Sequence, residues 1–260
     1  MTHTYLTPLR TRGIGVSLRP SRRPSRLVLG LIVVMGATVG AQDQSLGVSS
    51  ARDLLASEPR AFAQALETAR PPPVSAEAKA QILASLPEEG EVTHVGTEAR
   101  SKVAGLNKVL RAAERDAVYE IKVISVPQAA VALHARAIVL ISEAALNLLT
   151  APELQAAVAH ETGHEYVWAQ YEEARKSSDH QRVRELELMC DAIAIVILHR
   201  LDIEASTLTT AIEKIGRFNR QRLGIALNEA DYPSLAQRRE FARAVAAWEK
   251  GSEKPRKGGD

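Results

Sequence analysis

Only two short runs of the sequence carry the β-branched pattern of strands, and this scarcity constrains the fold more than any other feature. Residues 121–126 (IKVISV) form the first run, and residues 137–141 (AIVLI) form the second. Beyond Ser142 the chain is rich in Ala, Leu and Glu and has no further strand signal. The sequence therefore predicts a mainly helical α+β domain with a small β-sheet.

Helical spacing of apolar residues predicts most of the remaining elements. Thr150 and Glu153 form a capping box, and Pro152 sits in a first turn where its missing N–H costs nothing. A helix is therefore expected to begin at Ala151. Helices are expected at residues 50–70, 75–86, 97–114, 151–175, 179–199, 206–223 and 234–250.

Composition excludes several classes of protein. The 260 residues are 45% hydrophobic, enough for one sizeable core, and only 4% aromatic, which argues against a surface that stacks nucleic-acid bases. Cys190 is the single cysteine, so an internal disulfide framework and a cysteine-only zinc cluster are both excluded. Histidines and carboxylates must hold any metal.

The first 41 residues differ from the rest of the chain. They contain six Arg and no Asp or Glu, so the remainder carries 33 − 6 = 27 basic against 31 acidic residues, a net charge of −4. No nucleic-acid partner is expected for such a body. The apolar run at residues 27–41 is shorter than the roughly 20 residues of a membrane span and ends in small residues. It predicts a signal peptide cleaved before Gln42, with an uncleaved membrane anchor as the alternative.

The chemistry of the chain is concentrated in His160-Glu161-Thr162-Gly163-His164, within the helix expected from Ala151. A spacing of four residues places His160 and His164 one turn apart on the same helical face, where both can reach one zinc ion. Glu161 lies off that line but can reach a water molecule in an open coordination position. That position suits a general base.

A catalytic zinc site usually takes a third protein ligand, and His180, Glu187 and His199 are the downstream candidates. Glu187 and Asp191 share one face of the helix expected at residues 179–199. This spacing suits a glutamate ligand followed by an aspartate that orients a histidine ligand. The alternative for Glu187 is a solvent-exposed ion pair with Arg184.

HETGH and the later segment ELMCDA together resemble the metal-binding motifs of gluzincin metallopeptidases in the HtpX-like and CAAX prenyl protease-like family. The resemblance covers about residues 103–242 and includes PELQAAVAHETGHE and AIVLIS. It implies a zinc-dependent peptidase with one zinc ion per chain. By this resemblance His160, His164 and Glu187 are the zinc ligands, and Glu161 is the catalytic base.

Three departures from the family pattern affect what the resemblance implies. Cys190 replaces an alanine, which is typical of core packing. Tyr232 replaces the histidine of an element that ends at Arg238, and these two residues are the candidates for donating a hydrogen bond to the oxyanion. Tyr232 could instead belong to a segment that caps the next helix. The stretch between His164 and Glu187 is too polar to cross a bilayer, so prenylated substrates are not implied.

The sequence as a whole predicts an exported zinc metalloendopeptidase that acts on peptides or unfolded proteins. It is expected to be periplasmic or secreted, with membrane contact only through an uncleaved leader, which would anchor it to the inner membrane. The strand at residues 137–141 is expected to be an edge that can hold an extended peptide. The competing hypothesis is a non-catalytic binding or chaperone-like module with a structural zinc. The expected organisation is a leader at residues 1–41, a helical segment and mobile connector at 42–96, the metallopeptidase domain at 97–250 and a disordered tail at 251–260.

Overall fold

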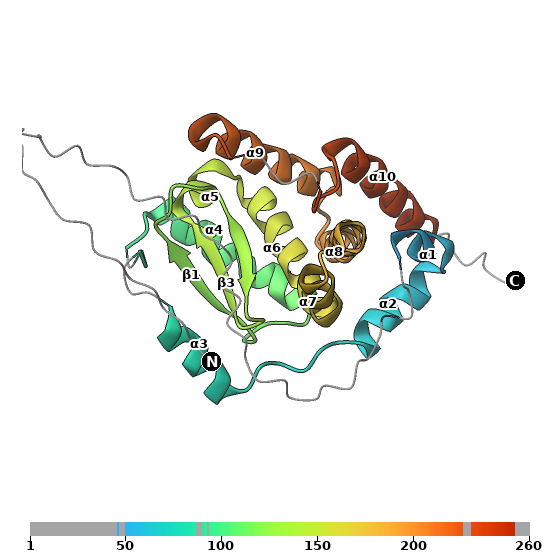
Figure 1. Cartoon of the computed structure of the whole chain (residues 1–260), viewed down its shortest axis with the longest axis horizontal. Coiled ribbons are helices and arrows are strands. Elements are labelled where there is room, and N and C mark those ends of the chain that lie inside the picture. The colour runs from blue at the N-terminus through green and yellow to red at the C-terminus, as the bar shows by residue number, and fades with distance from the viewer. Residues whose placement is uncertain (1–45, 47–49, 87–89, 93, 226–229, 253–260) are drawn as a thin grey trace, which may run out of the picture. The chain divides into compact units, whose positions relative to one another are not determined.

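The computed structural model describes residues 46, 50–86, 90–92, 94–225 and 230–252, which all belong to one compact unit. The expected leader and most of the expected tail lie outside these residues. The predicted α+β, mainly helical class is confirmed (Figure 1). The elements are α1 (Ala51–Ala56), α2 (Pro59–Thr68), α3 (Ala76–Ser85), α4 (Thr97–Ala112), β1 (Glu120–Ile124), β2 (Val131–His134), β3 (Ile138–Ser142), α5 (Glu143–Leu148), α6 (Ala151–Tyr166), α7 (Trp168–Lys176), α8 (His180–His199), α9 (Ser206–Leu223) and α10 (Leu235–Ser252).

The sheet has the order β1-β3-β2, with β1 parallel and β2 antiparallel to β3. Both predicted strand runs are present, but the expectation that residues 137–141 form an edge is wrong, because β3 lies between the other two strands. The edge strand that contacts α6 is β2, which the sequence analysis did not predict. Its four residues, VALH, are too few to show an alternating pattern.

Ser142 joins the sheet to the helices that follow it. It is fully buried, and its hydroxyl oxygen accepts hydrogen bonds from the backbone N–H of Ala130 at 2.9 Å and of Ala145 at 3.0 Å. One side chain therefore ends β3, caps α5 and holds the start of β2.

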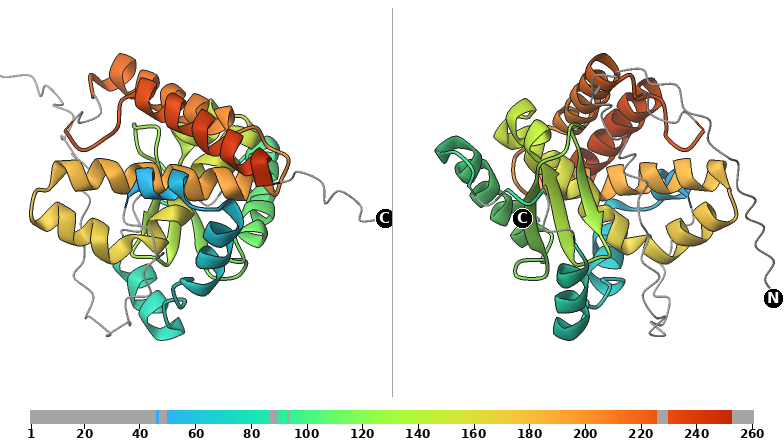
Figure 2. Two further views of the ribbon diagram at one scale, coloured as in Figure 1. Left: turned by 90° about the vertical axis from the view of Figure 1, so that its right-hand side faces the viewer. Right: turned by 60° about the vertical axis from the view of Figure 1, so that its left-hand side comes forward.

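Two long helices predicted from the sequence are each divided in the structure. The helix expected at residues 50–70 is α1 and α2, because Pro59 cannot continue a helix and instead occupies the first turn of a new one. The helix expected at residues 151–175 ends at Tyr166, and Val167, with φ −111° and ψ 11°, redirects the chain into α7. Helix α7 then runs beside α8 as a helical hairpin (Figure 2).

Helix α6 lies between the sheet and α8 (Figure 1). The capping box predicted for Thr150 and Glu153 is confirmed. Gly163 lets the two helices approach closely, since a Cβ atom at this position would lie 2.8 Å from the Cα of Cys190. Cys190 is fully buried in the core, as expected for a residue that stands where the family pattern has an alanine. This close contact sets α6 and α8 at the separation that the candidate site requires.

The segment before α4 packs against the same core. Phe62 is buried against the ring of Trp248, and the Trp248 indole N–H donates to the Ser57 carbonyl oxygen at 2.7 Å. Arg115 and Arg136 donate to the carbonyl oxygens of Pro71 at 2.7 Å and Pro72 at 2.8 Å. Residues 50–73 are thus fastened to the region that contains the sheet, α4 and α10. No helix among the described ranges is long and apolar enough to cross a membrane.

Candidate metal centre

The two histidines of the HETGH segment face one another on α6. His160 is buried and His164 is partly buried, and their ring centroids are 5.0 Å apart. The ligand atoms of His160, Glu161 and His164 lie within 4.8 Å of one another, and this is the one cluster of metal-ligating type among the described residues. The helix therefore presents both imidazoles to one point, as their spacing predicted.

Glu187 reaches the same point from α8. Its Oε2 lies 3.4 Å from His160 Nε2, and its Oε1 lies 3.8 Å from His164 Nε2. Ligands at about 2.0–2.1 Å from a tetrahedral zinc ion lie roughly 3.3–3.4 Å from one another. The three side chains are thus close to the separation that a shared zinc ion requires, and the donor set of two nitrogens and one oxygen is typical of catalytic zinc.

The protonation states of Glu187 and His164 suit metal ligands. Burial raises the pKa of Glu187. The hydrogen bond with His160 and the charges of His164, His160 and Arg238 lower this pKa by more than burial raises it, so the net shift is strongly downward. Burial lowers the pKa of His164 below its ordinary value, despite the nearby carboxylates. A metal ligand must be an ionised carboxylate or a neutral imidazole, so both groups are held in the competent form.

Glu161 lies beside the histidine pair but is held by a different element. Its Oε2 accepts a hydrogen bond from the backbone N–H of Leu133 in β2 at 2.9 Å. Glu161 is half-buried, whereas Glu187 is buried. One carboxylate therefore lies deep between the helices, and the other lies at the edge of the sheet, where solvent can reach it.

Asp191 contacts His160 from the side opposite the shared point. Its Oδ1 lies 2.9 Å from His160 Nδ1, although the two atoms make no well-aligned hydrogen bond in the described structure. Burial would lower the pKa of His160, but its contacts with Asp191 and Glu187 raise it to about 10. Asp191 is placed where a group that orients a histidine ligand must lie.

Arg238 lies in the site but is committed to its carboxylates. Its Nη1 donates to both oxygens of Asp191 at 2.6 and 2.7 Å, and its Nη2 donates to Glu187 Oε2 at 2.9 Å. Burial lowers the pKa of Arg238, but the charges of Asp191 and Glu187 raise it overall. The suggestion that Arg238 donates to an oxyanion is therefore revised: this guanidinium holds Glu187 and Asp191 in place.

Tyr171 is a site residue that the sequence did not reveal. Its hydroxyl donates to Glu187 Oε1 at 2.9 Å, and its ring packs edge-on against His164 with centroids 4.9 Å apart. The sequence placed it within one continuous helix and gave no sign that α7 turns back toward the site. The helix break at Val167 could not be read from residue types alone.

Tyr232 lies close to the same group of side chains. Burial and the charge of Glu187 raise the pKa of its phenol, and Arg175 and a hydrogen bond with Tyr171 oppose the rise. The capping role weighed for this segment belongs to Ser234, whose hydroxyl accepts from the Gln237 N–H at 3.2 Å while the Gln237 side chain accepts from the Ser234 N–H at 2.9 Å. Tyr232 is thus free of that role.

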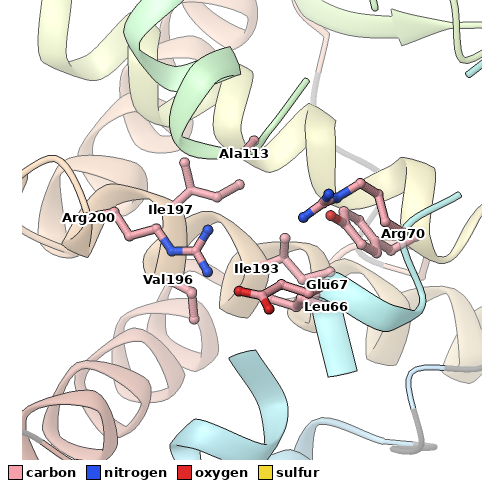
Figure 3. Close-up of a pocket in the computed structure, with 9 residues that line it drawn as sticks. Leu66, Glu67, Arg70, Ala113, Ile193, Val196, Ile197 and Arg200 are labelled. Atoms are coloured by element: carbon pink, nitrogen blue, oxygen red, sulfur yellow. The ribbon is translucent and has the colours of Figure 1, made fainter. Parts of the chain in front are cut away.

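The other residues considered from the sequence lie elsewhere or act differently. His180 is exposed and pairs with Asp231 at 2.6 Å, so it is not part of the cluster. Arg184 donates to the Ala230 carbonyl oxygen rather than pairing with Glu187. The small pocket drawn in Figure 3 is lined by residues such as Glu67, Arg70 and Arg200 and by none of the candidate site residues.

Comparison of the sequence with models of protein families and with curated proteins gives no match. The function is therefore inferred from the motifs and the geometry of the site.

Proposed function

We propose that this protein is a zinc-dependent peptidase of the gluzincin type, as the resemblance of its motifs implies. The observation that carries the proposal is the convergence of His160, His164 and Glu187, which approach within 3.4 and 3.8 Å from two helices, with Glu161 beside them. A bound zinc ion would polarise a peptide carbonyl group and lower the pKa of a water molecule. His160, His164 and Glu187 would hold it.

Glu161 is the proposed general base. Its carboxylate takes the proton of the attacking water and then delivers it to the nitrogen of the leaving amine. The half-buried position of Glu161 suits this role, because the group must meet both water and substrate.

The edge strand β2 is the proposed seat of an extended peptide, in place of β3 as first expected. Within the described part of the chain β2 pairs with β3 alone, and its Leu133 N–H donates to Glu161. A peptide added to this edge therefore runs past the base. Unstructured proteins and peptides are the substrates that can offer such a segment.

Two variants test the proposal. His160→Ala is expected to lose the single zinc ion per chain, because it removes a ligand. Glu161→Gln is expected to keep the zinc and to lose cleavage of an unfolded test protein, because it removes only the base. Metal content by atomic absorption and peptide release by mass spectrometry give the two measurements.

A second candidate function is a non-catalytic module with a structural zinc, and one observation favours it. Glu161 lies within the 4.8 Å cluster and could close the site as a fourth protein ligand. In that case Glu161→Gln would weaken zinc binding, and the parent protein would cleave nothing. Zinc retention in Glu161→Gln, together with cleavage by the parent alone, would exclude this alternative.

A further inference from the structure

We propose that Tyr171 is a positioning residue for the metal: its hydroxyl fixes the orientation of the Glu187 carboxylate and so strengthens metal binding, although Tyr171 is not itself a ligand. This inference rests on the proposed function, because it requires that Glu187 holds the metal. It goes beyond the motifs, because Tyr171 belongs to none of them.

Each oxygen of Glu187 has its own donor. Tyr171 donates to Oε1 at 2.9 Å, and Arg238 donates to Oε2 at 2.9 Å. The same two oxygens face His164 and His160 at 3.8 and 3.4 Å. The carboxylate cannot rotate about its last side-chain bond without breaking one of the two hydrogen bonds.

The two donors are not equivalent. Arg238 also binds both oxygens of Asp191, so its position is set by α8 and α10 together. Tyr171 comes from α7 and packs its ring against His164, so it links the orientation of two of the three proposed ligands.

The local fold is what brings Tyr171 to this place. In an unbroken helix Tyr171 would lie seven residues, or about 10 Å, further along the axis than His164. The break at Val167 turns α7 so that the two rings lie 4.9 Å apart.

Zinc affinity, measured by competition with a chromophoric chelator on the full chain, tests the inference. Tyr171→Phe is expected to bind zinc 10–100-fold more weakly than the parent, as is usual when a group that orients a ligand is removed. Tyr171→Met also lacks the donor and is expected to show the same loss. Tyr119→Phe is the matched control, because it removes a phenol that donates to a different buried carboxylate, Glu165, and it should bind zinc as the parent does.

A double-mutant cycle shows whether Tyr171 acts through Glu187. In a Glu187→Ala background, Tyr171→Phe is expected to cause no further loss of affinity. An equal loss in both backgrounds would overturn the inference, because Tyr171 would then act through His164 or bind the metal directly. Unchanged affinity in Tyr171→Phe would also overturn it and would leave the peptidase proposal intact. A parent protein that binds no zinc would overturn both.

Discussion

Glu165 on α6 and Glu187 on α8 are both buried carboxylates that accept a hydrogen bond from a tyrosine and face an arginine, yet their pKa values shift in opposite directions. Burial raises the pKa of Glu165, and the charges of Arg115 and Arg136 do not reverse the rise. Burial also raises the pKa of Glu187, but two imidazoles and Arg238 more than reverse it.

The difference lies in what each carboxylate faces. Glu165 pairs with Arg115 at 2.9 Å and Arg136 at 3.3 Å, and both arginines also bind carbonyl oxygens of the Pro71–Pro72 segment. The two arginines bridge Glu165 and these carbonyl oxygens, so the cluster fastens the N-terminal segment to α6. Glu187 faces imidazole nitrogens that can bind a metal. We therefore expect the Glu165 cluster to stabilise the fold and, under the proposed function, the Glu187 cluster to bind the metal.

The largest expected effect follows from removing Glu187. Glu187→Ala should weaken zinc binding by more than the roughly 100-fold that follows the loss of an orienting group. Arg238 keeps both oxygens of Asp191, so the fold should survive. Chelator competition measures the affinity, and circular dichroism checks the fold. If Glu187→Ala bound zinc as tightly as the parent, Glu187 would not be a metal ligand and would not differ from Glu165 in this respect.

Glu165→Ala should show the opposite pattern, with lower stability of the fold and unchanged zinc binding. It leaves Arg115, which is only 2% exposed, without its carboxylate partner, and breaking a buried ion pair in this way costs about 3–5 kcal/mol of unfolding free energy. The folded fraction should still bind one zinc ion. Urea unfolding measures the loss, and a change below about 1 kcal/mol would contradict the role of the Glu165 cluster in fastening the N-terminal segment to α6.

Gly163→Ala should lower both the stability of the fold and the zinc affinity, because Gly163 is the point at which α6 and α8 approach closely. The added Cβ would meet Cys190 Cα at 2.8 Å, and overpacking of this kind costs about 1–3 kcal/mol. Separation of α6 from α8 should also weaken zinc binding. Gly105→Ala on α4 is the control, because its Cβ would meet only Gln155 Nε2 at 3.5 Å and should be tolerated. If the two variants had the same stability and the same zinc affinity, the close approach of α6 and α8 would not be required for either property.

The smallest expected effect concerns Glu153 at the start of α6. It accepts from the Thr150 N–H at 2.9 Å and pairs with Lys214 at 2.7 Å. Burial raises its pKa, but these partners lower it overall. Because the folded-state pKa is depressed, the stability that ionised Glu153 contributes is present above the unfolded pKa of about 4.3 and is lost as the pH falls through the folded value.

Glu153→Gln should therefore cost roughly 0.5–1 kcal/mol at about pH 7, the contribution of the ion pair with Lys214, and progressively less as the pH falls below about 4. Urea titrations of the two proteins across this range measure the difference. A gap that stays constant with pH would assign the effect to packing rather than to charge. Zinc affinity should not change, because Glu153 lies two turns before His160.

Much of the helical framework follows from local signals. The capping box at Thr150, the end of α9 at Leu223 and the limits of α8 all depend on residues within one or two turns, and they lie where the pattern predicts them. The break at Val167 and the edge strand β2 do not, because neither contains a residue type that demands them. Both depend on packing against distant elements.

The sequence by itself determined the mainly helical class, the placing of His160 and His164 on one helical face and the candidacy of Glu187 and Asp191. These follow from periodicity, which local backbone geometry dictates. Only the tertiary structure decided that Glu187 meets the histidines, that Arg238 binds carboxylates 47 and 51 residues away and that Tyr171 donates to Glu187. Such contacts join separate helices, and their partners are selected by the packing of the core, which spacing along the chain does not record.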